Sequence, residues 1–258
     1  MFQLKTAFIF LFGVLISLQS LTAQNIPSKQ TSITPSEQQI LKSYERWSKM
    51  KDDWPNLNRY KAANALVPPP SKNEKRVVFM GNSITDAWIR ISPEFFKGKP
   101  YFDRGISGQT TPQMLIRFRP DVIKLRPSVV VILAGTNDIA GNTGPSSLEM
   151  IEDNLASMAE LAKFHHIKVI LCSVLPAYDY PWRPGVKPAE KIVTLNQWIK
   201  KYAEKNNLYY LDYYSSMVDE RKGMKQEYTV DGVHPNKLGY QVMEDLVEKA
   251  IQEVLSRK

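Results

Sequence analysis

"VVFMGNSITDAW", residues 77–88, joins an apolar, β-branched run to the start of a helical pattern. The run ends at Gly81, and the small polar residues Asn82, Ser83 and Thr85 follow it. Runs of this kind are typical of strands that a parallel sheet buries on both faces. A polar residue directly after such a strand either caps the next helix or is presented for chemistry. This stretch alone leaves both interpretations open for Ser83.

Strand and helix patterns alternate along the rest of the chain. Strands are predicted for RVVFM (76–80), YFDRG (101–105), SVVVILAG (128–135), IKVILCSV (167–174) and NLYYLDYY (207–214). Helical patterns lie between and after them, at about residues 112–124, 146–164, 188–206 and 237–256. This alternation predicts an α/β fold with a doubly wound parallel sheet. Such sheets place their sites beyond the carboxyl ends of the strands.

The first residues have the layout of a secretory signal peptide. Lys5 precedes an almost wholly apolar run, Thr6–Leu18, and small and polar residues then lead to a cleavage position at Ala23. The run is shorter than the roughly 20 residues of a membrane span. We therefore expect residues 1–23 to be removed and the protein to be secreted or periplasmic, without stable membrane insertion. A retained anchor is the alternative, because Leu21 disfavours cleavage. No Cys follows the run, so lipid attachment is not expected.

Residues 24–70 are expected to form an N-terminal helical extension, and residues 71–258 the main domain. The stretch SEQQILKSYERWSKMKDDW (36–54) predicts a helix that Ser36 caps, and a triple proline then separates it from the first core strand. The pattern leaves open whether residues 36–66 cover the site or brace the domain.

Composition excludes several classes of function. The net charge is +8, but Lys and Arg are scattered rather than gathered into a basic stripe with interleaved aromatics, so nucleic-acid binding is not expected. The charge supports a mild preference for anionic surfaces or substrates. Cys172 is the only cysteine and lies in an apolar run, so we expect a buried structural thiol and no internal disulfide. No metal site is expected, because His165 and His166 lie at the amino end of a strand.

Small and polar residues collect directly after each predicted strand. In chain order they are Gly81-Asn82-Ser83, Gly105-Ile106-Ser107-Gly108, Gly135-Thr136-Asn137-Asp138, the aromatic loop LPAYDYPWRPG (175–185) and DGVHPN (231–236). A serine esterase needs a serine, a base that takes its proton and a carboxylate that holds the base. Ser83, His234 and Asp231 supply these groups. Fixed donors must also stabilise the oxyanion, and the N–H groups of Ser83 and Gly108 and the amide of Asn137 are available for it.

Each block also has a purely structural interpretation. Ser83 and Asn137 can be helix caps, and Gly108 can be a turn glycine. His234, which a proline follows, can be a helix lead-in. The blocks favour catalysis because they arrive in the required order at successive strand ends.

These blocks resemble those of the SGNH (GDSL-like) hydrolase superfamily. GNSIT, RGISGQTT, LAGTNDIA and DGVHPN match its Ser, Gly, Asn and Asp-x-x-His blocks, from the first predicted strand to the C-terminus. The resemblance implies a flavodoxin-like, three-layer α/β/α sandwich on a five-stranded parallel sheet ordered 2-1-3-4-5, with no metal or organic cofactor. It also implies that Ser83 is the nucleophile and His234 the base, oriented by Asp231. Ser83, Gly108 and Asn137 are then the oxyanion hole.

Two positions depart from the family pattern. Asn82 stands where the family usually has Asp, and Asp103 precedes the glycine block where Asn is frequent. Neither carries a proton in this mechanism, so we expect changed local hydrogen bonding rather than lost activity. A catalytically idle relative is the alternative. Asp86 and Asp138, which follow two of the blocks, are expected to bond local backbone.

The aromatic loop is the candidate substrate contact. It leaves the carboxyl end of the fourth strand and contains Tyr178, Tyr180, Trp182 and Arg183. Aromatic faces suit sugar rings as well as acyl chains, and Arg183 suits a carboxylate. Packing of the loop onto the domain is the alternative.

Export, the aromatic loop and the lack of a long apolar lid in the sequence favour one class of substrate. We expect a small-molecule or polysaccharide ester, chiefly an O-acetyl group on a carbohydrate. The alternatives are a lipid acylhydrolase of lysophospholipase or platelet-activating-factor-acetylhydrolase type, and an idle carbohydrate-binding protein. The oligomeric state is left open.

Overall fold

The computed structural model describes residues 34–257. The predicted signal peptide, residues 1–23, therefore lies outside the described residues. The chain divides between Glu45 and Arg46, and the unit that begins at Arg46 holds the whole sheet. Over the described residues, no helix combines the length and the apolar character that a membrane span requires.

Thr34, rather than Ser36, caps the first helix, α1 (Pro35–Asp52). Glu37 N–H donates to Thr34 Oγ1 (3.3 Å), and Thr34 N–H donates to Glu37 Oε2 (2.8 Å). This reciprocal pair is a capping box. The predicted cap at Ser36 was wrong because the helix begins at Pro35, which suits the first turn.

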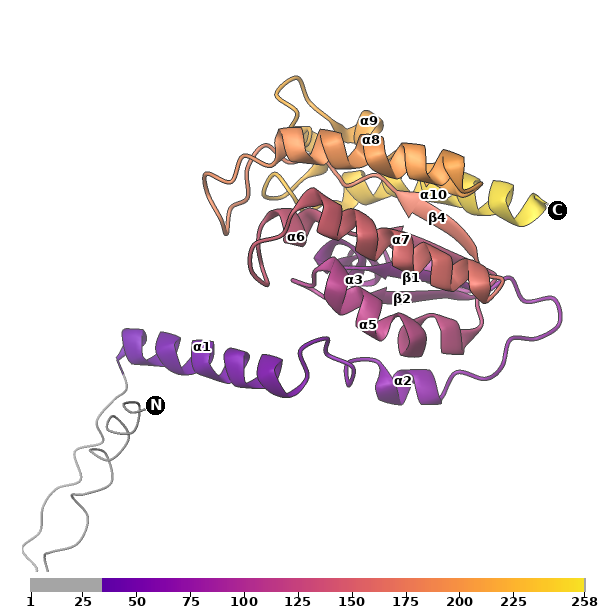
Figure 1. The fold of residues 1–258 in the computed structure, drawn as a ribbon, viewed down its shortest axis with the longest axis horizontal. Helices are drawn as coiled ribbons and strands as arrows, with labels where there is room; N and C mark the ends of the chain where they lie inside the picture. Colours follow the sequence, from indigo (N-terminus) through magenta and orange to yellow (C-terminus); the bar gives the residue numbers. More distant parts are fainter. Residues whose placement is uncertain (1–33, 258) are drawn as a thin grey trace, which may run out of the picture. The chain divides into compact units, whose positions relative to one another are not determined.

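Five parallel strands form one sheet in the predicted order, β2-β1-β3-β4-β5. The paired strands β1 and β2 lie side by side in Figure 1. Their bounds are β1 Val77–Gly81, β2 Tyr101–Gly105, β3 Val129–Leu133, β4 Lys168–Cys172 and β5 Tyr209–Leu211. Gly81, the last residue of β1, lies beside Gly105 of β2 and Leu133 of β3. Because these three strands end in line, the blocks that follow them leave the sheet side by side.

The fifth strand is shorter than predicted. Asp212 Oδ1 accepts the N–H of Ser215 (2.9 Å), and Ser173 Oγ accepts the N–H of Tyr214 (2.9 Å). These bonds turn the chain out of the sheet and into α9 (Tyr214–Met217). The strand predicted for residues 207–214 therefore ends at Leu211, although the aromatic run continues beyond it.

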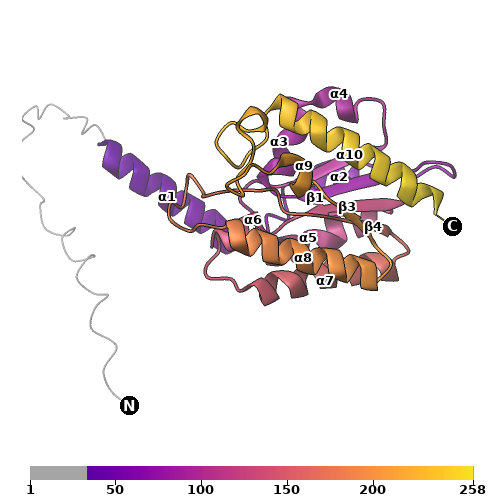
Figure 2. The same ribbon diagram turned by 90° about the horizontal axis from the view of Figure 1, so that it is seen from above.

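Helices cover both faces of the sheet and give the predicted three layers (Figure 2). One face carries α3 Ser83–Ile91, α4 Pro93–Phe96, α9 and α10 Lys237–Ser256. The other carries α5 Thr111–Asp121, α7 Leu148–Phe164 and α8 Ala189–Lys205. Short elements are α2 Lys61–Ala65, α6 Thr136–Ile139 and the 3₁₀ turns η1 Ile123–Leu125 and η2 Gln226–Tyr228. Alternate β1 residues serve the two cores: Phe79 faces the α3 layer and Met80 the α5 layer.

Cys172 and His165 have structural roles, as predicted. Cys172 is buried in β4, and burial raises the pKa of its thiol. His165 is the C-terminal cap residue of α7, at the amino end of β4.

Asp103 is a buried carboxyl on β2, with only 6% of its surface exposed. Its Oδ1 accepts the N–H of Gly105 (2.7 Å), whereas Oδ2 has no hydrogen-bond partner among residues 34–257. Burial raises the pKa of Asp103 to about 7, although the bond from Gly105 opposes the shift. The ionised form is therefore disfavoured in the folded state.

We expect the stability of the protein to depend on this carboxyl. In the unfolded chain Asp103 ionises near pH 4, but in the folded protein it holds its proton until about pH 7. The folded state thus binds more protons between these values, and stability falls as pH rises through that window. Asp103→Asn should remove this loss, so its stability relative to wild type should improve from pH 4 to 7 by on the order of 4 kcal/mol and then stay level. Urea unfolding of both proteins at pH 4.5 to 8 measures it; a difference that does not change with pH would contradict the assignment.

Candidate active site

Three side chains meet at the carboxyl end of β1. Ser83 is the first residue of α3, and its Oγ lies 2.9 Å from His234 Nε2. His234 Nδ1 lies 2.8 Å from Asp231 Oδ2. The two latter residues belong to the loop before α10, far from Ser83 in sequence. A hydroxyl, an imidazole and a carboxylate in this series are arranged for proton transfer from the serine.

The loop fixes Asp231 and His234 by its own backbone. Asp231 Oδ1 accepts the N–H groups of Val233 (3.0 Å) and His234 (2.8 Å), and Thr229 Oγ1 donates to the carbonyl of His234 (2.8 Å). Burial by itself raises the pKa of Asp231, but the hydrogen bonds from the backbone and ring of His234 outweigh it. The pKa of Asp231 therefore lies below its ordinary value, which keeps the carboxylate ionised beside the imidazole.

Asn82, and not Ser83, caps the helix that follows β1. Asn82 is the N-cap of α3, and its Oδ1 accepts the N–H of Ile84 (3.2 Å). The capping role is thus filled one residue before the serine. Ser83 Oγ is left to face His234. The departure from Asp at position 82 keeps a cap acceptor without adding a charge.

The donors predicted for an oxyanion keep hydrogens that are free to donate. The backbone N–H groups of Ser83 and Gly108 donate to no residue that the structure describes. Asn137 Nδ2 donates to the carbonyl of Gln109 (2.9 Å), which holds the amide and leaves its second hydrogen. Gly108 has φ +80°, and a Cβ there would meet nothing within 4 Å, so open space adjoins its Cα. These three donors are the ones that we predicted from the sequence for an oxyanion hole.

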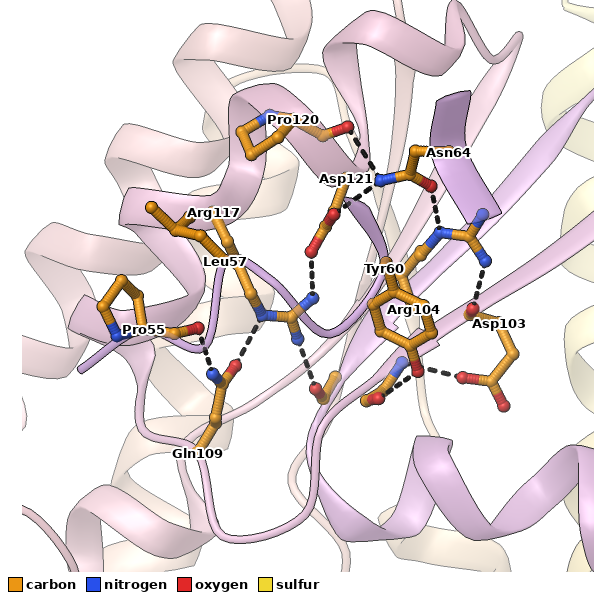
Figure 3. Close-up of polar contacts among 12 residues, drawn as sticks. Pro55, Leu57, Tyr60, Asn64, Asp103, Arg104, Gln109, Arg117, Pro120 and Asp121 are labelled. Atoms are coloured by element: carbon orange, nitrogen blue, oxygen red, sulfur yellow. Dashed lines mark hydrogen bonds and ion pairs between the residues drawn. The ribbon is translucent and has the colours of Figure 1, made fainter. Parts of the chain in front are cut away.

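Arg117 joins the segments that carry these groups (Figure 3). It is fully buried on α5. Its Nη2 donates to the carbonyl of Gly81 (2.9 Å), its Nη1 to Asp121 Oδ2 (3.0 Å) and its Nε to Gln109 Oε1. Burial lowers the pKa of the guanidinium, and the Asp121 carboxylate opposes that shift. One side chain therefore ties the end of β1 to the residue whose carbonyl holds Asn137.

Residues 54–64 brace this network from outside (Figure 3). Gln109 Nε2 donates to the carbonyl of Pro55 (2.7 Å), and the Tyr60 hydroxyl donates to the carbonyl of Gly105. Asn64 Nδ2 donates to Asp121 Oδ1 (2.7 Å). Of the two roles left open for this segment, these bonds support bracing.

The aromatic loop packs beside His234. Trp182, 38% exposed, stacks on Tyr180 with ring centres 5.0 Å apart and lies 5.8 Å from the His234 ring. Its Nε1 donates to Asn142 Oδ1 (3.1 Å). Tyr180 is fully buried and its ring supports Trp182, so of these two predicted substrate contacts only Trp182 presents an exposed face. Tyr178 is exposed.

Charged residues near the site bond segments that are distant in the sequence. Arg183 donates to the carbonyl of Gly141 (3.3 Å), so it is tied to the asparagine block. Asp138 Oδ1 accepts the N–H (2.9 Å) and hydroxyl (2.6 Å) of Thr111, and Asp86 Oδ2 accepts both groups of Ser107. Both carboxylates bond backbone N–H groups, but these belong to distant segments, so the prediction that they bond local backbone was wrong. No group of three or more His, Cys, Asp or Glu residues in the described chain is placed to hold a metal ion.

The GDSL-like lipase/acylhydrolase family model matches residues 79–242. The chain belongs to this family. Its members are carboxylic ester hydrolases, which agrees with the resemblance seen in the four blocks.

Solved structures of this family include close relatives. A Bacteroides fragilis protein named as an acylhydrolase is 54% identical, with a TM-score of 0.78, over 79% of this chain and 99% of that one. A GDSL-like lipase from Bacteroides thetaiotaomicron is 53% identical, with a TM-score of 0.76, over 77% and 98% of the two chains.

Among curated sequences, an acetylxylan esterase from Xylanibacter ruminicola is 25% identical over 72% of this chain and 45% of its own length. The chain thus spans less than half the length of the curated relatives it matches.

Sequence reasoning missed Arg117, Gln109 and Asn64 in this GDSL-like domain. A signal for the first was present, because Arg117 and Asp121 share the stripe of α5 that also carries the buried Met114 and Phe118. Two opposite charges one turn apart on an apolar stripe indicate a buried pair. Gln109 and Asn64 lie on other segments, and no comparable pattern in the sequence indicates their roles.

Replacing Arg117 tests whether it holds the domain together. Arg117→Met should leave Asp121 buried without its cation and the Gly81 carbonyl without its donor. We expect a loss of on the order of 3–5 kcal/mol in the free energy of unfolding, measured by urea denaturation. Arg119→Met, two residues along the same helix but exposed, is the matched control and should change stability by less than about 0.5 kcal/mol. Equal losses in both variants would contradict a special role for Arg117.

Proposed function

We propose that this domain removes O-acyl groups, chiefly O-acetyl, from carbohydrate by serine catalysis. The observation that carries the proposal is the series from Ser83 Oγ to His234 (2.9 Å) to Asp231 (2.8 Å) at the carboxyl end of the sheet. A serine and base within hydrogen-bond reach, with the base held by a carboxylate, is the arrangement that activates a serine. This arrangement argues against the alternative of a carbohydrate-binding protein without catalytic activity.

The proposed mechanism proceeds in two halves. Ser83 Oγ attacks the ester carbonyl while His234 Nε2 takes the hydroxyl proton, and Asp231 stabilises the imidazolium. The carbonyl oxygen becomes an oxyanion that accepts hydrogen bonds from the N–H groups of Ser83 and Gly108 and from the Asn137 amide. The sugar hydroxyl then leaves with the proton from His234, and an acyl-serine remains. Water, deprotonated by His234, releases the acid and restores Ser83.

Support for a carbohydrate substrate comes from the site and from one relative. Trp182 presents a partly exposed ring beside His234, and aromatic rings of this kind stack on sugars. The matched Xylanibacter ruminicola protein is an acetylxylan esterase by name. A lipid acylhydrolase would use the same triad, so acyl chain length separates the two: p-nitrophenyl acetate should be hydrolysed faster than the decanoate. A preference for the decanoate would favour the lipid alternative.

The proposed place of action is outside the cytoplasm. Residues 1–23 have the layout of a signal peptide, which supports export. Expression in a bacterium, followed by N-terminal sequencing of the exported protein, should find a chain that begins at Gln24. A retained residue 1 would support the anchor alternative.

The first prediction concerns the nucleophile. Ser83→Ala should lower kcat for p-nitrophenyl acetate by about 10⁴–10⁶-fold, because no other group takes the acyl chain. Its melting temperature should stay near that of wild type. Ser146→Ala, on the loop before α7, is the control and should keep full activity. A fluorophosphonate probe should label wild type and Ser146→Ala but not Ser83→Ala; labelling of the last would show that the nucleophile lies elsewhere.

The second prediction concerns the oxyanion. Asn137→Ala removes a side-chain donor that acts in the transition state, so kcat should fall by about 10²–10³-fold with KM little changed. Steady-state kinetics on p-nitrophenyl acetate measure the split. A change confined to KM would make Asn137 a substrate-binding residue instead.

The third prediction concerns Trp182. If its ring stacks on sugar, Trp182→Ala should lower kcat/KM for an acetylated xylo-oligosaccharide by roughly five-fold, equivalent to about 1 kcal/mol. Hydrolysis of p-nitrophenyl acetate, which is too small to need the platform, should change little. Equal losses on both esters, together with a lower melting temperature, would assign Trp182 to loop packing alone.

A further inference from the structure

A cavity lies on the outer side of β2, apart from the residues Ser83, His234 and Asp231. It has a volume of about 600 Å³ and lies among α2, α3 and β2. That volume is within the range of small-molecule sites. Ser83, His234 and Asp231 do not line it. The catalytic proposal therefore leaves this cavity without a role.

A buried arginine in its wall has an unused donor. Arg104 is 6% exposed; its Nε donates to Asn64 Oδ1 (2.9 Å) and its Nη1 to the carbonyl of Asp103 (2.6 Å). Its Nη2 makes no hydrogen bond to any residue that the structure describes, as Figure 3 shows for this close-up. Burial lowers the pKa of Arg104, which reflects the cost of a cation without full solvation. An anion in the cavity would relieve that cost.

Two further guanidinium groups stand at the cavity. Arg90, on the last turn of α3, is exposed and has no hydrogen-bond or ion-pair partner within residues 34–257. Arg59 pairs with Asp86 at 3.3 Å, and that pair is partly exposed. The positive groups at this cavity thus exceed the negative ones, since Asp103 is protonated over much of the range below neutral pH. Arginine forks match the geometry of a carboxylate.

The rest of the wall suits a hydroxylated ring. The Tyr60 ring lies 4.7 Å from the Arg104 guanidinium, and Phe102 also borders the cavity. Asp103 also borders the cavity, but its unpartnered Oδ2 is buried away from it. An aromatic face and a free guanidinium nitrogen correspond to the ring and the acid group of a sugar acid.

The glycine block borders the cavity. Ser107 lines the cavity and directly precedes Gly108, one of the donors proposed for the oxyanion. Asp86, in the first turn of α3, accepts the N–H (3.1 Å) and hydroxyl (2.6 Å) of Ser107. The cavity and the proposed ester site thus adjoin neighbouring residues of one block, and this adjacency is the basis for assigning both to one glycan.

We propose that this cavity binds the carboxylate of an acidic sugar unit in the glycan whose ester is cleaved at Ser83. Arg104 Nη2 and Arg90 hold the carboxylate, and the Tyr60 ring borders the sugar. The inference rests on the proposed carbohydrate function for the ester half of the substrate. Binding of the acidic unit is nevertheless measurable without turnover.

Calorimetry on full-length Ser83→Ala protein tests the binding. The probes are xylotetraose, xylotetraose with one glucuronic acid branch, free glucuronate and inorganic phosphate. The branched oligosaccharide should bind about tenfold more tightly than the neutral one, and the preference should shrink with added salt. Arg90→Gln in the same background should reduce the preference at least about fivefold. Arg119→Gln removes the same charge elsewhere on the surface and should preserve it.

Catalytic measurements separate this proposal from the proposed function. In otherwise wild-type protein, Arg90→Gln should lower kcat/KM on the acetylated acidic oligosaccharide at least about fivefold and leave p-nitrophenyl acetate unchanged. Equal binding of neutral and acidic oligosaccharides, or equal effects of Arg90→Gln and Arg119→Gln, would overturn the cavity assignment even if glycan deacetylation is found. Phosphate that binds as tightly as the branched oligosaccharide would also overturn it. Preferred binding of the acidic oligosaccharide without any glycan deacetylation would instead overturn the proposed function and keep the cavity.

Discussion

The buried guanidinium of Arg117 is the constraint on which the rest of the site depends. A cation with no exposed surface must have its donors satisfied, because an unpaired buried charge costs several kcal/mol. Its partners are the Gly81 carbonyl, Asp121 and Gln109, which lie on three different segments. Displacement of any one of them exposes the charge to an unfavourable environment. The end of β1 and the glycine block are therefore held in one arrangement.

The sheet determines where the residues of the site lie. Parallel strands that end in register deliver their loops to one edge, so residues far apart in sequence meet without a long connection. Glycine is required where the layers are closest: a Cβ on Gly105 would lie 2.0 Å from the backbone nitrogen of Asp86. Close packing of α3 on the end of β2 sets the position of the helix start and hence of Ser83. The positions of Ser83 and of the backbone donors are thus set by the packing of α3 against the sheet.

The sequence was sufficient for features that repeat locally. Continuous Val and Ile runs predicted the strands, and 3.6-residue periodicity predicted α5, α7, α8 and α10 to within a few residues. It was insufficient where tertiary partners decide. Tyr180 and Trp182 have similar aromatic character, yet one is buried under the other, and only the packing of the loop determines which. The partners of Arg117 likewise come from segments whose proximity no local pattern encodes.

β2 is an edge strand, and the segment before the sheet changes what that edge offers to other molecules. An exposed strand edge presents unpaired backbone groups on which another chain can add a strand. Here the Gly105 N–H is taken by the Asp103 carboxyl, the Gly105 carbonyl by the Tyr60 hydroxyl and the Asp103 carbonyl by Arg104. The opposite edge, β5, is only three residues long. Both borders of the sheet are thus poor templates for strand addition, which protects the protein against edge-to-edge aggregation.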